Sequence, residues 1–151
     1  MRQTGLVELG WREWISLADL GDVKLLAKVD TGAKTCALHA FYVDPFDKDG
    51  ENWVRFGLHP SRKSSKKEIH CVARINDHRP VRDSSGNEEL RYVIETPITV
   101  GTIVFACEMT LTNRDSMRYR FLLGRNAIRG RYIVNPARSC ILGKPMEATR
   151  S

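Results

Sequence analysis

The sequence predicts a mostly β fold, a closed or nearly closed barrel of short strands with one short helix near the C-terminus. Alternating apolar and polar residues, interrupted by Gly, Pro and Asp, recur along the chain and are typical of short strands joined by turns. Only the segment around Asn126 favours a helical turn. With 151 residues and 42% hydrophobic content, the chain can form one domain with a core. We expect that domain at residues 1–143 and a flexible tail at 144–151.

The N-terminal part of the chain is predicted to form a bent strand followed by a hairpin. Residues 5–10 alternate as a strand does, and residues 11–17 are expected to continue the sheet after a bend at Gly10. A tight turn at residues 20–22 then leads into a further strand at 23–29. The carboxyl end of this hairpin is therefore well placed to present the residues that follow it.

The middle of the chain supplies further strands and two polar connections. Strands are expected at residues 36–43, 53–58, 68–75 and 90–94. Asp44-Pro45 and the loop at 47–50 are expected to close the first of them. Residues 59–67 are basic and polar, which favours a solvated surface loop over a dedicated binding loop. Residues 76–89 are expected to form an exposed polar hairpin or a long loop.

The C-terminal part begins with a clear hairpin pattern at residues 97–111, hinged at Gly101-Thr102. A short strand at residues 121–124 precedes the helical turn near Asn126. Residues 132–136 and 140–142 are expected to add short strands. These segments complete the all-β pattern.

The stretch with the most distinctive chemistry is Asp30-Thr31-Gly32, directly after the strand at 23–29. The strand delivers Asp30 to its end, and Gly32 allows an unusual backbone turn there. Paired carboxylates about 3 Å apart cannot both ionise, so one can act as a general acid and the other as a general base towards a shared water. An alternative is that Asp30 only caps its own turn. By itself the tripeptide is a weak signal.

A second segment, Phe121-Leu122-Leu123-Gly124-Arg125-Asn126, strengthens the catalytic interpretation. Together, VDTGAKTCALHA, VRDSSGNEELRYVIE and FLLGRNAIRGRYIVNP resemble the RimB-type family of retropepsin-like aspartic peptidases, often labelled "ATP-dependent zinc protease". The resemblance covers residues 5–142. It implies catalytic roles for Asp30, Thr31 and Gly32, a role for Ala33 beside them, and packing of the Leu-Gly segment against the catalytic turn.

The resemblance also implies a homodimer. A second Asp-Thr-Gly or Asp-Ser-Gly turn is needed, but residues 83–86 contain one residue too many and residues 115–117 lack the Gly. The second carboxylate must therefore come from another copy of the chain, with Asp30 facing its symmetry mate. Thr31 would brace the two turns. No metal and no cofactor are expected for this chemistry.

The charge of the chain points to an acidic partner. Lys and Arg total 24 against 18 Asp and Glu, a net charge of +6 that favours an acidic peptide, nucleic acid or a ribosomal surface. We expect Ala33, Lys34, Arg79, Arg82 and Arg91 to contact substrate, with Arg79 and Arg82 on a flap at residues 76–89. The resemblance implies trimming of glutamate residues added to a ribosomal protein tail.

Two alternatives from other classes remain. Cys36, His39, His70 and Cys71 could bind zinc in a zinc-dependent hydrolase, although His-Glu-x-x-His is absent and His70 and Cys71 would point to opposite faces of a strand. A non-catalytic basic β-barrel that binds RNA or ribosomes would explain the charge but not the Asp-Thr-Gly motif. No apolar run is long enough for a membrane span, and we expect a cytoplasmic protein whose four cysteines stay reduced.

Overall fold

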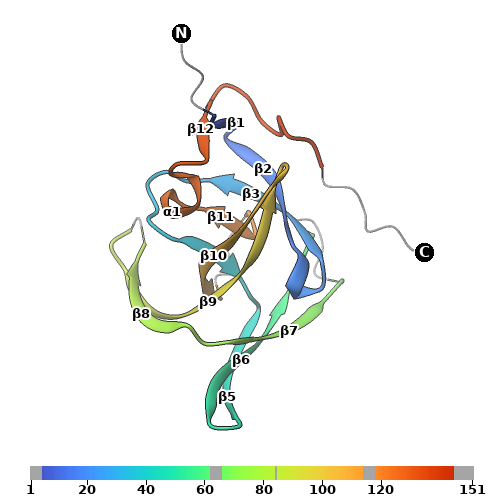
Figure 1. The fold of residues 1–151 in the computed structure, drawn as a ribbon. Coiled ribbons are helices and arrows are strands. Elements are labelled where there is room, and N and C mark those ends of the chain that lie inside the picture. Colours follow the sequence, from blue (N-terminus) through green and yellow to red (C-terminus); the bar gives the residue numbers. More distant parts are fainter. Residues whose placement is uncertain (1–4, 62–65, 84, 114–117, 145–151) are drawn as a thin grey trace, which may run out of the picture.

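Six strands close into a barrel around the apolar side chains of the alternating runs (Figure 1). The structure is a computed structural model that describes residues 5–61, 66–83, 85–113 and 118–144. The barrel strands are β2 (Arg12–Leu17), β3 (Val23–Val29), β4 (Cys36–His39), β9 (Glu88–Val100), β10 (Ile103–Thr112) and β11 (Phe121–Leu123). They pair in the order β10-β4-β11-β3-β2-β9, and β9 pairs with β10 to close the ring. The predicted barrel is therefore confirmed.

The remaining elements lie around this barrel. They are β1 (Val7–Leu9), η1 (Ala18–Leu20), β5 (Tyr42–Lys48), β6 (Glu51–Leu58), β7 (Ile69–Arg74), β8 (Asp77–Arg82), α1 (Arg125–Ile128) and β12 (Tyr132–Val134). Strands β1 and β12 pair in parallel, which places the first strand of the chain beside the last one. Within the described residues, no helix has the length and apolar character needed to cross a membrane.

The strand β3 shows why the alternating pattern folds as it does. Val23, Leu25 and Ala27 are buried in the barrel, whereas Lys24 and Lys28 lie on the outer side. Because successive side chains of a strand alternate between its faces, one apolar run supplies the core while the other side stays polar. The core so formed includes large buried side chains from β2, β4, β6, β9, β10 and β11.

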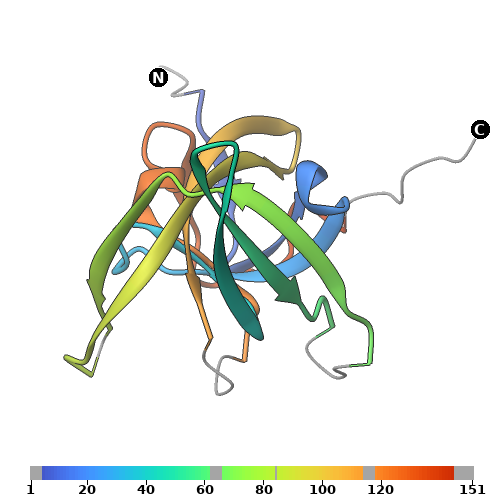
Figure 2. The ribbon, with the colours of Figure 1, turned by 90° about the horizontal axis from the view of Figure 1, so that it is seen from below.

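The expected strand at residues 36–43 is wrong in its extent. The strand β4 ends at His39, and a new strand, β5, begins at Tyr42. Strand β5 leaves the barrel and pairs with β6 in a separate sheet of order β5-β6-β7. Pro45 does not end a strand; it lies inside β5, opposite Val54. It is tolerated there because β5 is an edge strand with pairing on one side only. Figure 2 shows this sheet in front of the barrel.

The expected boundary at Pro97 is also wrong, because β9 runs without a break from Glu88 to Val100. Pro97 pairs with Ala106 of β10 on one side. On its other side it falls between the stretch paired with β8 and the single pairing of Thr99 with β2, so its missing N–H is tolerated. The expected polar hairpin is formed by β8 and the first half of β9.

Residues 140–142 do not form the expected strand. Their backbone instead turns around the carboxylate of Glu13, which is fully buried. Glu13 accepts hydrogen bonds from the N–H groups of Gly10 at 2.7 Å, Ile141 at 2.9 Å and Leu142 at 3.1 Å. A carboxylate with three N–H donors can replace strand pairing for these groups, because buried backbone donors need partners. Of the expected flexible tail at residues 144–151, only Lys144 is described; residues 145–151 lie outside the described residues.

Candidate active site

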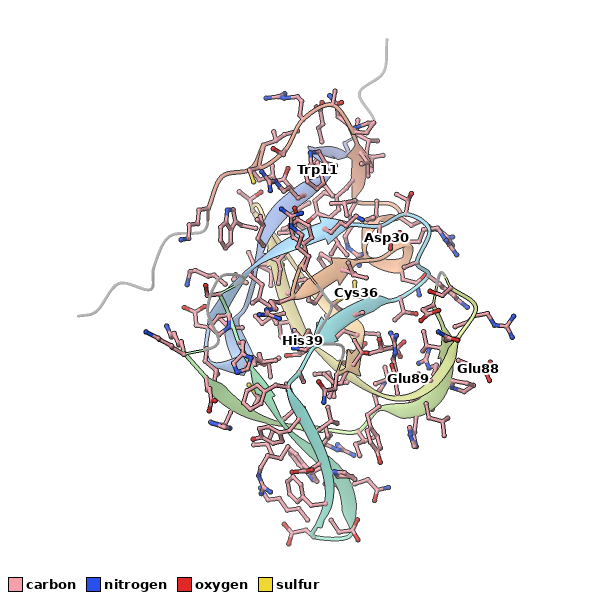
Figure 3. The ribbon with its side chains drawn as sticks, turned by 180° about the vertical axis from the view of Figure 1, so that it is seen from behind. Trp11, Asp30, Cys36, His39, Glu88 and Glu89 are labelled. Carbon is pink, nitrogen blue, oxygen red and sulfur yellow. The ribbon has the colours of Figure 1, made fainter. Side chains whose placement is uncertain are left out.

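Asp30 lies at the carboxyl end of β3, where it is half-buried. Its backbone N–H donates to the carbonyl of Leu123 at 2.9 Å, which continues the parallel pairing of β3 with β11. The Asp-Thr-Gly motif and the Leu-Leu-Gly segment, almost a hundred residues apart, are therefore neighbours as expected. Figure 3 shows Asp30 beside the strand that carries Cys36.

The turn after Asp30 is closed by its own side chain. Oδ1 of Asp30 accepts the N–H of Gly32 at 3.0 Å, and the Asp30 carbonyl accepts the N–H of Ala33 at 3.2 Å. Among the described residues, Oδ2 has no hydrogen-bond partner. One oxygen thus fixes the carboxylate in place and the other stays available, so the capping role and a catalytic role are compatible.

Gly124 holds the turn from the inner side. An added Cβ at this position would lie 2.6 Å from the carbonyl carbon of Thr35 and 3.0 Å from the carbonyl oxygen of Ala33. These are backbone atoms and cannot rotate away. Only glycine therefore lets β11 approach the chain that follows the Asp-Thr-Gly turn.

The short helix α1 adds three hydrogen bonds to the same turn. The N–H of Arg125 donates to Ala33 at 2.7 Å, and the N–H of Asn126 donates to Lys34 at 3.0 Å. The guanidinium of Arg125 donates to the carbonyl of Thr31 at 2.9 Å. The expected helix is confirmed, and its residues fix the turn through two backbone hydrogen bonds and one from the Arg125 side chain.

Cys36 lies beneath this assembly and has a structural role. Its Sγ accepts the N–H of Gly124 at 3.3 Å and faces Sγ of Cys107 at 3.6 Å. The hydrogen bond from the Cys107 thiol, together with that from Gly124, lowers the pKa of Cys36. Donating that bond, together with burial, raises the pKa of Cys107. All four cysteines are free, and Cys36 is only 1% exposed.

The residues expected beside Asp30 lie on the open side of the turn. Thr31, Gly32 and Lys34 are exposed, and Ala33 is half-buried. Their side chains and backbone can therefore be reached by a substrate or by a second copy of the chain.

The three arginines expected to contact substrate differ in their surroundings. Arg79 is bonded to Asp77 at 2.9 Å and to Glu108 at 3.0 Å. Arg91 is 7% exposed and donates to Glu89 at 2.6 Å and to Thr110 at 3.2 Å.

Arg82 alone of the three has a largely open side chain, 71% exposed and 3.9 Å from Glu88. Arg82 is the last residue of β8, next to the tip of the β8–β9 hairpin, and this hairpin lies on the same side of the barrel as α1 in Figures 1 and 2. Arg82 therefore has the most freedom of the three to meet a substrate.

Glu89 was not anticipated from the sequence. Its Oε1 accepts from Arg91 and also from the hydroxyl of Thr112 at 3.0 Å. This small network ties the β8–β9 hairpin, close to its tip, to the end of β10. Glu89 and Thr112 are 23 residues apart along the chain, and no local motif marks their contact.

The residues considered for zinc do not converge. Cys36 and His39 lie on β4, next to Cys107 and the barrel core. On β7, Cys71 is buried and faces the carbonyl of Leu20, whereas His70 is exposed and bonded to Tyr42. Among the described residues, no three His, Cys, Asp or Glu side chains are grouped to hold a metal ion.

Comparison with known proteins connects this geometry to a family. The sequence profile described as "Retropepsin-like aspartic endopeptidase RimB" matches residues 8–145. Proteins named "Probable alpha-L-glutamate ligase" from Desulfotalea psychrophila and Shewanella pealeana are each 43% identical over 136 residues, or 90% of this chain. The chain spans only 29% and 30% of their respective lengths.

A solved structure shares the fold. A crystal structure of a Legionella pneumophila protein of unknown function superposes with a TM-score of 0.74 and 28% identity, covering 90% of this chain and 98% of that one. The profile match spans the Asp-Thr-Gly turn, β11 and α1 alike. The chain therefore belongs to the RimB-like family of retropepsin-like aspartic endopeptidases.

Proposed function

We propose that the protein is an aspartic-type peptidase that works as a homodimer, with Asp30 of each copy contributing one carboxylate. The observation that carries the proposal is the Asp30 turn, which β11, Gly124 and α1 fix from the inner side while its outer side stays exposed. Each copy holds one such turn. A two-fold axis through this open side would bring the two carboxylates together.

In such a pair the two carboxylates share one proton. One Asp30 is ionised and takes a proton from the attacking water, and its mate is protonated and gives a proton to the amide being cleaved. The Gly32 N–H on Oδ1 orients each carboxylate so that its other oxygen faces the water. Thr31, exposed at the turn, braces the two copies.

We further propose that the substrate is an acidic peptide, in particular glutamate residues added to the tail of a ribosomal protein in the cytoplasm. The net charge of +6 favours such a chain. The name of the longer relatives connects proteins that carry this domain with amide bonds to glutamate. In this proposal Ala33, Lys34 and Arg82, which are exposed or half-buried, contact the substrate, and the ion pairs of Arg79 and Arg91 support the hairpin that forms the flap.

The test is cleavage of a peptide with a tail of glutamates, followed by mass spectrometry. Wild type and Asp30→Asn are compared with and without a strong chelator, with folding checked by circular dichroism. We expect cleavage by wild type in both conditions and none by Asp30→Asn. Activity retained in Asp30→Asn and lost on chelation would point to a zinc hydrolase, and no cleavage by folded wild type would favour a binding protein.

A further inference from the structure

The outer side of the β2–β3 hairpin carries a row of side chains that the catalytic site does not use. Lys24, Leu26 and Lys28 are alternate residues of β3, and Trp14 lies opposite Leu26 in β2. Because alternate residues of a strand share a face, these side chains all lie on the outside of the barrel. Lys28 is exposed, Trp14 and Lys24 are half-buried, and Leu26 is buried between them. We call this surface, with Arg12 opposite Lys28 and with Lys144, the basic face.

Two hollows open on the basic face. The larger, about 490 Å³, is lined by Trp14, Lys24, Leu26 and Lys144 among others. The smaller, about 380 Å³, is lined by Trp11, Lys28, Arg118, Tyr119 and Leu122.

The smaller hollow lies next to the catalytic turn. Lys28 precedes Asp30 by two residues, about 7 Å along a strand. The backbone carbonyl of Trp11 accepts a hydrogen bond from the N–H of Val29, the residue directly before Asp30. Figure 3 shows Trp11 and Asp30 in the same part of the molecule.

The charge of the basic face is one-sided. The cationic side chains on it or lining its hollows are Arg12, Lys24, Lys28, Lys67, Arg118 and Lys144. The acidic side chain among the lining residues is Asp22, which is paired with Lys24 at 3.3 Å. A second copy of this chain would meet it with like charge, which is unfavourable. An anionic partner fits instead.

We propose that the basic face is a docking surface for an acidic polypeptide segment, which it holds in extended form from the hollow beside Asp30 towards the hollow over Trp14. This inference rests on the proposed function, because it assigns the surface that binds the acidic substrate of that reaction. In an extended peptide, side chains on the same side repeat about every 6.6 to 7 Å. Lys24 and Lys28 are four strand residues apart and thus match carboxylates four peptide residues apart.

Single-stranded nucleic acid fits the basic face less well. Its binding sites generally offer free aromatic faces on which bases stack. Here the guanidinium of Arg12 lies 4.8 Å over the Trp11 ring, and the ammonium of Lys144 lies 4.8 Å over the Trp14 ring. Tyr119 is buried and meets Trp11 edge-on. The faces of the Trp11 and Trp14 rings are therefore covered by cationic groups and are not free for base stacking.

The test measures binding of fluorescein-labelled octaglutamate to full-length Asp30→Asn protein by fluorescence anisotropy. Lys24→Gln, Lys28→Gln and Lys144→Gln are added singly and together. The matched control is Lys48→Gln, since Lys48 lies 5.0 Å over Trp53 in β6, outside the basic face. Octaglutamine and an octauridylate RNA are the comparison ligands, and sedimentation velocity reports the oligomeric state.

We expect each basic-face substitution to weaken octaglutamate binding about two- to fivefold and the triple variant about tenfold or more, as for exposed ion pairs. Lys48→Gln should change binding less than about twofold, because its charge lies outside the basic face. A triple variant that binds no worse than the control would overturn the inference. So would tighter RNA binding through the same lysines, or a loss of self-association caused by the triple substitution.

The same variants separate this inference from the proposed function. With Asp30 intact, cleavage of octaglutamate that is unaffected by the triple substitution would refute the basic face and leave the peptidase standing. Binding that depends on these lysines without any cleavage by wild type would refute the peptidase and leave the basic face standing.

Discussion

Gly124→Ala should loosen the catalytic turn without unfolding the protein. The new Cβ would lie 2.6 Å from the carbonyl carbon of Thr35, whereas ordinary van der Waals contacts begin near 3.4 Å. The chain must therefore shift by most of an ångström. That shift would strain two hydrogen bonds: the one from the Arg125 N–H to the Ala33 carbonyl, at 2.7 Å, and the one from the Gly124 N–H to Sγ of Cys36.

The cost can be estimated from similar overpacked sites, which lose about 1 to 3 kcal/mol. For a chain of this size, 2 kcal/mol corresponds to a fall in Tm of roughly 4 to 8 °C. A displacement of about 1 Å near reacting groups can lower the rate about a hundredfold. We therefore expect a modest loss of stability and a much larger loss of peptide cleavage.

The assays are urea unfolding followed by tryptophan fluorescence, and cleavage of a glutamate-tailed peptide. The control is Gly130→Ala, where nothing lies within 4 Å of the new Cβ and the φ of +80° alone costs about 1 to 2 kcal/mol. It should keep its cleavage rate. If Gly124→Ala matched the control in both stability and cleavage, the close approach of β11 would not be what fixes the turn.

The other predictions concern stability and the flap. Glu13→Gln should lower the free energy of unfolding by about 2 kcal/mol or more, because an amide cannot accept all three backbone N–H bonds; an unchanged urea midpoint would contradict this. Arg91→Ala should cost about 1 to 3 kcal/mol because it removes a buried guanidinium that is bonded to Glu89 and Thr110, whereas Arg82→Ala should change stability by less than about 0.5 kcal/mol and raise KM for acidic peptides; equal effects in urea unfolding would refute the distinction. Burial raises the pKa of Cys71 to about 11 from 9.0, so the folded state holds its proton more tightly; stability should fall as pH rises from about 9 to 11, and less so in Cys71→Ala.

The neighbourhood of Asp30 and Gly124 could be predicted because both ends of the contact carry a recognisable motif. An apolar run before Asp-Thr-Gly and another before Gly-Arg-Asn each indicate a short strand and its turn. The structure pairs these two strands and places the helix as expected. Local sequence therefore sufficed where each element had its own signal.

The predictions are wrong where the neighbouring strands, or a residue distant in the sequence, determine the local structure. The sequence predicts strand boundaries at Pro45 and Pro97, but each proline lies inside a strand whose neighbours do not need its N–H. The turn at residues 140–142 depends on Glu13, nearly 130 residues earlier.

The burial of Arg91 against Thr110, 19 residues away, is not revealed by strand alternation alone. Hydrogen bonds between strands of this kind leave no local pattern in the sequence.

The central claim is that two copies of Asp30 form one catalytic pair, and mixing tests it most directly. Wild type and Asp30→Asn are unfolded together in equal amounts, refolded at constant total concentration, and assayed on the glutamate-tailed peptide. If both carboxylates of a dimer are required, activity should fall to about one quarter of that of wild type alone, since only dimers of two wild-type chains are active. A fall to about one half would mean that each chain acts by itself, and the shared pair would be wrong.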